Sequence, residues 1–163
     1  MPVTVTVRDL GLPKPLIDAA FMREIGTLAM RLIRTRTEKG VDRSGNAFQA
    51  YTPAYAEQRS KAGLGTLPNL TVSGRMLNDM AVTDATPNKA TIGFRSSGGK
   101  ATGRTFIQRS RAVGAEDKAR WHDREGAGKS RVKREFLGLT DEEVGKVRTA
   151  VERHLETIVA RLR

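Results

Sequence analysis

The sequence predicts a single domain of the α+β class, with two long helices packed on a small antiparallel sheet and a long basic loop insertion. Three observations predict this fold. The chain has 163 residues, a length typical of one hydrophobic core. Alternating apolar residues occur at the N-terminus and again near residue 90, as strands require. Apolar residues at three- and four-residue steps mark one helix early in the chain and another at its end.

The N-terminal part predicts a strand followed by a long helix. Val3, Val5 and Val7 alternate with polar residues, which favours a short strand. After Pro13 and Pro15, one helical face carries Ile17, Phe21, Ile25, Leu28, Leu32 and Ile33. Lys39 and Gly40 are the predicted end of this helix, because glycine tolerates the left-handed conformation found there.

The middle of the chain predicts two short helices and a hairpin. Thr52 and Pro53 suit the start of a helix that ends near Gly63. Ser73 is a candidate cap for a brief helix containing Met76, Leu77 and Met80. Residues 81–84 and 89–95 then favour two strands joined across Thr86, Pro87 and Asn88. The alternation of Ala90, Ile92 and Phe94 with Thr91, Gly93 and Arg95 predicts that one face is buried and the other wet.

The C-terminal helix has a recognisable start. Thr140 and Glu143 have the spacing of a capping box, in which each side chain binds the backbone amide of the other residue. An apolar stripe follows, formed by Val144, Val147, Val151, Leu155, Ile158 and Leu162. We therefore expect a helix from about residue 141 to the end.

The charge is concentrated in one part of the chain. The formal net charge is +11, and residues 95–134 hold 12 Lys plus Arg against 4 Asp plus Glu. The remaining residues hold 17 and 14, so they are nearly balanced. Glycine-rich stretches lie within the basic part, which indicates loops. The interpretation is a basic mobile insertion at about residues 96–134.

Composition excludes several functional classes. Without cysteine there is no disulfide framework, thiolate zinc site or cysteine nucleophile. The chain has only two histidines, His122 and His154, so a histidine-rich metal site is not expected. No apolar run reaches the roughly 18–20 residues that span a bilayer, and the N-terminus lacks the pattern of a signal peptide. No cofactor, small-molecule substrate or membrane partner is expected.

Three motifs suggest chemistry but lack its context. The stretch Gly126-Ala127-Gly128-Lys129-Ser130 resembles a phosphate-binding loop, yet Asp123 stands where that loop needs its first glycine. His122, Asp123 and Glu125 lie too close together on one segment to converge on a metal ion. Asp42 begins a calcium-like loop whose twelfth position would be Pro53 in place of glutamate. The chain is therefore not expected to be an enzyme; a nucleotide-binding enzyme using Lys129 and Ser130 is a minor alternative.

The basic insertion supports two functional hypotheses. Its cations could neutralise nucleic-acid phosphates, or it could dock acidic surfaces of partner subunits. No helix-turn-helix, zinc finger or aromatic stacking platform accompanies it, so base-specific recognition is not expected. The candidate contacts with subunits or DNA are Lys100, Arg104, Arg109, Arg111, Arg120, Trp121, Arg124, Lys129, Arg131, Lys133 and Arg134.

From about residue 25 onward, the segments resemble the phage virion morphogenesis family, the tail-completion or neck proteins of Mu-like and related tailed phages. The resemblance rests on residues 40–48, then on Leu70-Thr71-Val72-Ser73-Gly74-Arg75-Met76-Leu77, and on the strand at 90–94. Its most specific part is Arg134-Glu135-Phe136-Leu137-Gly138-Leu139, which leads into the last helix. The family usually has a tyrosine–alanine pair, a histidine and a glycine before this part, whereas this chain has Ala119, Trp121, His122 and Gly126.

The resemblance implies a structural role in the virion. A neck or tail-completion subunit would form a ring with itself, commonly a hexamer, between head connector and tail. It would be assembled in the bacterial host cytoplasm and would not be an enzyme. Phe136, Leu137 and Leu139 are the candidate anchors of the final helix. A tail terminator is similar in size and symmetry, and a small basic nucleic-acid-binding protein without sequence specificity is the alternative.

Overall fold

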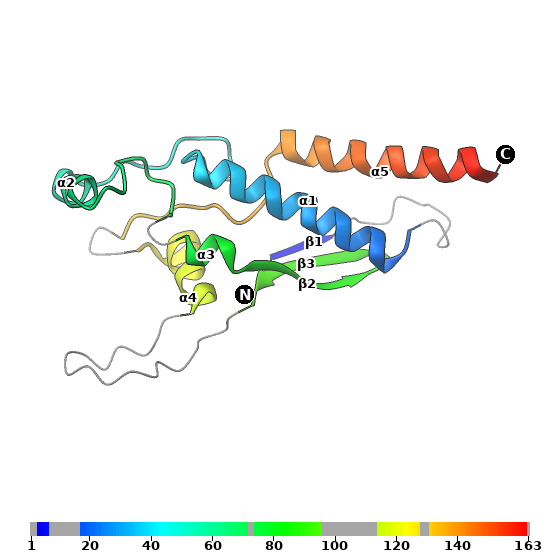
Figure 1. Ribbon diagram of the computed structural model, residues 1–163, viewed down its shortest axis with the longest axis horizontal. Coiled ribbons are helices and arrows are strands. Elements are labelled where there is room, and N and C mark those ends of the chain that lie inside the picture. Colours follow the sequence, from blue (N-terminus) through cyan, green and yellow to red (C-terminus); the bar gives the residue numbers. More distant parts are fainter. Residues whose placement is uncertain (1–2, 7–16, 72–73, 96–113, 128–130, 163) are drawn as a thin grey trace.

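A computed structural model describes residues 3–6, 17–71, 74–95, 114–127 and 131–162, and it has an α+β fold (Figure 1). The strands are β1 (Val3–Thr6), β2 (Met80–Thr86) and β3 (Lys89–Phe94). The helices are α1 (Ala19–Glu38), α2 (Pro53–Lys61), α3 (Arg75–Asn78), α4 (Ala115–Arg120) and α5 (Asp141–Leu162), and a π-helical turn, η2 (Trp121–Glu125), continues α4. The predicted fold class is confirmed.

The sheet is antiparallel, and β3 lies at its centre in the order β1-β3-β2. Val3 pairs with Ile92, and Met80 pairs with Phe94. The β2–β3 register shifts between Val82 and Asp84. The sequence predicted a wet face for β3, but Thr91 is buried on that side as well. This prediction was wrong because a central strand has neighbouring side chains on both flanks.

Helix α1 lies between the sheet and α5 (Figure 1). Its N-cap is Asp18, whose carboxylate accepts a hydrogen bond from the Phe21 amide at 2.7 Å. Gly26 allows the close approach to the sheet, since a Cβ there would lie 3.0 Å from both Ala90 Cβ and a Val82 methyl. Gly40, with φ +76°, follows the end of α1 as predicted.

The second long helix is placed differently from the prediction. Helix α5 packs on α1, on the side away from the sheet, so the expectation that both helices lie on the sheet is wrong for α5. The physical reason is that α1 already covers that sheet face and has a second apolar side for α5. Val147 and Val151 are buried there, and the His154 ring stacks on Phe21 with centroids 3.6 Å apart.

The basic insertion is partly helical where the structure describes it. The sequence predicted a mobile loop over residues 96–134, but α4 and η2 occupy residues 115–125. Ala115 and Ala119 are buried, and α4 contacts α3 and β3. Helix α4 is therefore stabilised by packing, although its polar sequence shows no regular spacing of apolar residues that would predict a helix. Residues 96–113 and 128–130 of the predicted loop lie outside the described residues, as does the predicted Ser73 cap.

Candidate assembly surface

The segment leading into α5 is tied to the end of α1 by Arg36. This side chain is buried, and it forms an ion pair with the Glu143 carboxylate. It also donates to the carbonyls of Phe136 at 2.7 Å and Gly138 at 2.9 Å. Burial lowers the pKa of Arg36, and the adjacent Glu143 opposes that change. One guanidinium therefore fixes both the segment and the first turn of α5.

Glu143 has two roles in this arrangement. Its carboxylate accepts from the Thr140 amide at 2.9 Å, and its own amide donates to the Thr140 hydroxyl at 3.2 Å. The predicted capping box is thus confirmed. The ion pair with Arg36 was missed, although a signal was present: Arg36 continues the buried positions Ala29 and Ile33 along one face of α1.

The three candidate anchors differ in burial. Phe136 is fully buried at 0% exposure within the main hydrophobic cluster. Leu137 and Leu139 are half-buried and pack against that cluster. The Leu137 amide also donates to the buried Asp123 carboxylate at 2.9 Å, so this segment binds η2 as well as α1.

Two arginines stack on one tyrosine at the base of α2. The Arg59 and Arg134 guanidinium carbons lie 4.9 Å and 5.0 Å from the Tyr51 ring centroid. Arg59 donates to the carbonyls of Leu64 at 2.9 Å and Gly65 at 3.0 Å, and Arg134 donates to the Gln49 carbonyl at 3.1 Å. These contacts hold α2 and the loop after it, residues 52–69, which we call the arm.

Arg134 was predicted as an exposed contact for subunits or DNA, and the structure contradicts this. The residue is only 6% exposed, and it is occupied by Tyr51 and Gln49. The hydrophobic residues that follow it carry it into the core, where the tyrosine face stabilises its charge. Sequence reasoning also missed Tyr51 and Arg59, because the cluster that they form is completed by Arg134, which reaches Tyr51 only through the path of the chain between them.

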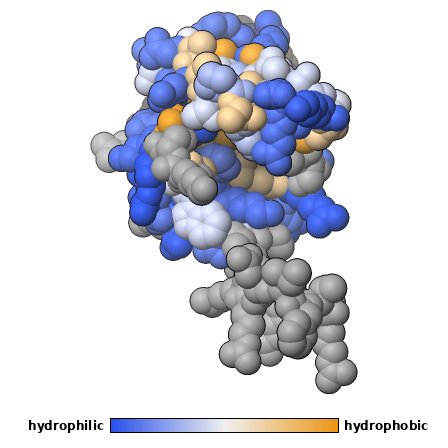
Figure 2. Space-filling view, turned by 90° about the vertical axis from the view of Figure 1, so that its left-hand side faces the viewer, coloured by the Kyte–Doolittle hydropathy of each residue, from blue (hydrophilic) through white to orange (hydrophobic). Residues whose placement is uncertain are grey.

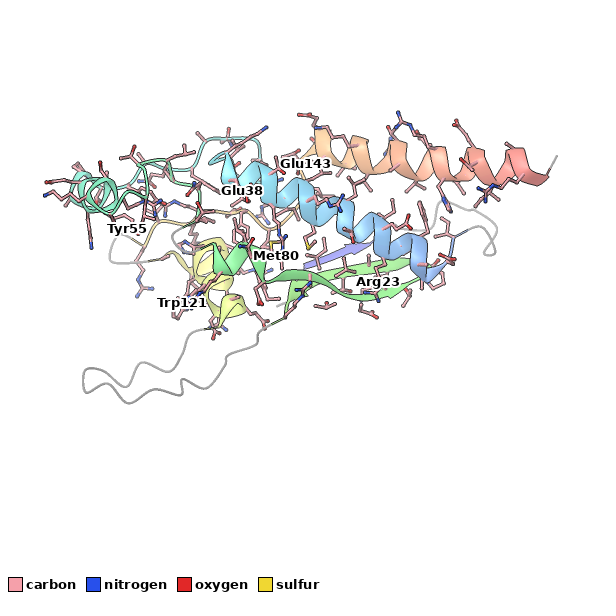
Figure 3. The ribbon with its side chains drawn as sticks, viewed as in Figure 1. Arg23, Glu38, Tyr55, Met80, Trp121 and Glu143 are labelled. Atoms are coloured by element: carbon pink, nitrogen blue, oxygen red, sulfur yellow. The ribbon has the colours of Figure 1, made fainter. Side chains whose placement is uncertain are left out.

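The remaining predicted contacts fall into two groups. Arg120, Trp121, Arg124, Arg131 and Lys133 are exposed, with Trp121 on η2 below α3 (Figure 3). Arg120 forms ion pairs with Asp117 and Glu125, at 3.7 and 3.0 Å, and Arg124 lies 3.9 Å from Asp123. The others lie outside the described residues: Lys100, Arg104, Arg109, Arg111 and Lys129.

The positive charge is therefore divided along the chain. Residues 114–127, which form α4 and η2, hold four acidic and three basic side chains. Residues 96–113 and 128–134 each hold four basic side chains and no acidic one. The helical part is balanced by its own ion pairs, and the excess charge belongs to the two segments that flank it.

His122 is half-buried and lies near Arg134. Burial lowers its pKa to about 4, and the nearby Arg134 acts in the same direction. Its carbonyl accepts from the Arg134 amide at 2.6 Å. Within the described residues no group of three or more metal-ligating side chains gathers, at His122 or elsewhere.

Exposed apolar side chains occur near two ends of the molecule. On the arm, Tyr55, Leu64 and Leu67 are 39%, 38% and 51% exposed. On α5, Val159 is 43% exposed, and Leu155 and Ile158 are half-buried. Figure 2 views the end that carries α2, where apolar surface lies among hydrophilic surface. Apolar side chains left exposed in this way are candidates for contact with another chain.

Comparisons with protein-family models, with curated proteins and with solved structures find no match to this chain. None of the described helices is both long and apolar enough to cross a membrane.

Proposed function

We infer that this protein is a structural virion subunit of the phage neck. In this proposal it is a tail-completion or head–tail joining subunit that forms a ring of six copies between head connector and tail. It binds neighbouring connector and tail proteins, has no catalytic role, and is assembled in the bacterial host cytoplasm.

One observation supports this proposal most. The four segments that carry the family resemblance come together in a single hydrophobic cluster, to which they contribute Phe48, Leu70, Met76, Leu77, Ile92 and Phe136. Residues with this role determine how a chain folds, so the resemblance concerns the segments that build the core. A likeness confined to surface loops would carry much less weight.

The surface is consistent with a subunit that has protein neighbours. Exposed apolar residues lie on the arm and on α5, and a ring subunit needs such surfaces for its neighbours. The basic flanking segments would then contact acidic partner surfaces or the phosphates of packaged DNA. Contacts with phosphates would be indifferent to base sequence.

The proposal is tested by native mass spectrometry and negative-stain electron microscopy of the full chain. We expect closed rings, formed alone or on addition of the neighbouring head-connector and tail proteins. A protein that stays monomeric with those proteins, and binds duplex DNA at nanomolar strength in physiological salt, would contradict the proposal. That outcome would favour the basic nucleic-acid-binding alternative, which the net charge of +11 keeps open.

A further inference from the structure

We propose that neighbouring copies of this chain join head to tail, with the arm of one copy seated on the C-terminal stripe of the next. The C-terminal stripe consists of Leu155, Ile158 and Val159 on α5. This inference rests on the proposed function, because it names the two surfaces that would close the ring.

The loop of the arm, residues 62–69, presents an uncharged surface, although 29% of the chain is charged. The charged side chains of the arm lie on α2, where Glu57 and Lys61 form an exposed ion pair. Leu67 is 51% exposed and Leu64 38% exposed in this stretch. The described helices and strands make few contacts with α2, which lies at one end of the molecule (Figure 1). The arm is therefore available to a second chain.

The arm is also held in a defined shape. Arg59 is 2% exposed, and it binds the carbonyls of Leu64 and Gly65 while stacking on Tyr51. Because the loop is already ordered by these contacts, binding through Leu64 and Leu67 costs little further conformational entropy.

The C-terminal stripe has a matching character at the opposite end of the molecule. The last turns of α5 extend past the start of α1, while α2 lies at the far side (Figure 1). Leu155, Ile158 and Val159 share one face of α5, and Val159 is 43% exposed, while the exposed Glu156 and Arg161 lie on other faces of the same turns. Both surfaces thus expose apolar side chains, and each is incompletely covered within one copy.

Charge favours these two surfaces as the place where copies meet. Each copy carries a net charge of +11, so faces rich in Lys and Arg repel one another. Contact at charge-poor surfaces avoids this repulsion and the cost of burying unpaired cations. Because two different surfaces at opposite ends would pair, the contact is heterologous, and heterologous contacts generate rings when the rotation closes.

The test uses single substitutions in the full chain. Leu67→Asp places a carboxylate on the arm, and Val159→Asp places one on the C-terminal stripe. Asn88→Asp, in the exposed β2–β3 turn, adds the same charge elsewhere and serves as the control. Each of the first two changes should raise the dissociation constant between copies at least about 30-fold, whereas the control should leave it unchanged. The constant is measured by sedimentation over a concentration series.

A mixture of the two variants gives the decisive result. Each Leu67→Asp copy retains an intact stripe, and each Val159→Asp copy retains an intact arm. The mixture should therefore form a dimer and stop there, as measured by native mass spectrometry. Rings that persist in either variant would overturn this inference and leave the proposed function standing. Dimers of Val159→Asp alone would mean that arm pairs with arm, which also overturns it. A wild-type chain that stays monomeric even with the neighbouring head-connector and tail proteins would overturn both.

Discussion

At the scale of single residues, the ion pair between Arg36 and Glu143 ties the start of α5 to the end of α1. Arg36 is buried away from bulk solvent, and Glu143 both neutralises it and completes the capping box. Removing one member of a buried pair is more costly than the pair's net contribution, because the remaining charge stays buried.

Glu143→Gln should therefore lower the free energy of unfolding by about 3 kcal/mol. Glutamine retains an oxygen that can accept from the Thr140 amide, so the loss reports the missing charge. The matched control is Glu142→Gln, which removes an exposed partner of Lys146 on the same turn and should change stability little. Urea unfolding measures both, and equal effects of the two variants would contradict the role assigned to Arg36.

His122 gives the stability a pH dependence whose sign can be worked out. The pKa of His122 is about 4 in the folded chain, against 6.5 for an unperturbed histidine. Between these values the unfolded state binds more protons, so acid favours unfolding. From pH 7 to pH 5 this residue should remove about 2 kcal/mol of stability.

Comparison with His122→Gln isolates this contribution. The variant should lose less stability than the wild type between pH 7 and pH 5, since glutamine does not titrate. Denaturant midpoints at the two pH values provide the measurement. Parallel losses in both proteins would show that other groups cause the acid sensitivity.

At the scale of elements, the segment from Arg134 to Thr140 joins three parts of the fold. Phe136 enters the core, Leu137 binds Asp123 of η2, and the carbonyls of Phe136 and Gly138 receive Arg36. This segment has no regular secondary structure, and its position is determined by side chains and by single hydrogen bonds.

Phe136→Ala should cost about 3–5 kcal/mol, because the ring is fully buried and a cavity would remain. Thermal unfolding, with calorimetry to obtain the free energy, measures this loss. A loss well below 1 kcal/mol would contradict the burial of Phe136 and place the ring at the surface.

The arm provides a second prediction at this scale. Tyr51→Ala removes the ring on which Arg59 and Arg134 stack, so the arm should lose its fixed shape. Trypsin should then cleave after Lys61 about tenfold faster, since local opening exposes the backbone. Tyr55→Ala is the comparison variant, because Tyr55 is 39% exposed and meets the Tyr51 ring at its edge, whereas the two guanidinium groups stack on Tyr51 itself. Equal cleavage rates in the two variants would contradict the role of Tyr51.

Elements with local signals could be predicted from the sequence. The starts of α2 and α5, the end of α1 and the β2–β3 turn each have characteristic residues within a few positions. Contacts between distant residues could not. Arg36 meets Glu143 across 107 positions, and Arg134 meets Gln49 across 85. No local pattern indicates that Arg134 faces the core, so it was assigned to the surface.

At the scale of the whole molecule, the surface charge distinguishes the two functional hypotheses. Copies with a net charge of +11 repel one another, and added salt screens that repulsion. Binding to nucleic acid has the opposite dependence, because salt competes with the bound phosphates.

Association between copies should therefore strengthen as salt rises from 0.01 M to 0.15 M, where the Debye length falls from about 30 Å to about 8 Å. Affinity for duplex DNA should fall over the same range. Light scattering and DNA-binding titrations at matched salt concentrations measure the two trends. Association that weakens steeply with salt would contradict contact through charge-poor surfaces.

The distance along the chain between Arg36 and Glu143 also has a consequence for synthesis. A ribosome releases Arg36, on α1, long before it releases Glu143, whose carboxylate neutralises Arg36 in the folded chain. Phe136 emerges only shortly before Glu143. Until then, Arg36 has no carboxylate with which it could be buried, and the hydrophobic core lacks Phe136. The fold therefore cannot close until residue 143 has been made, and a message truncated before codon 143 should yield a product that proteases remove.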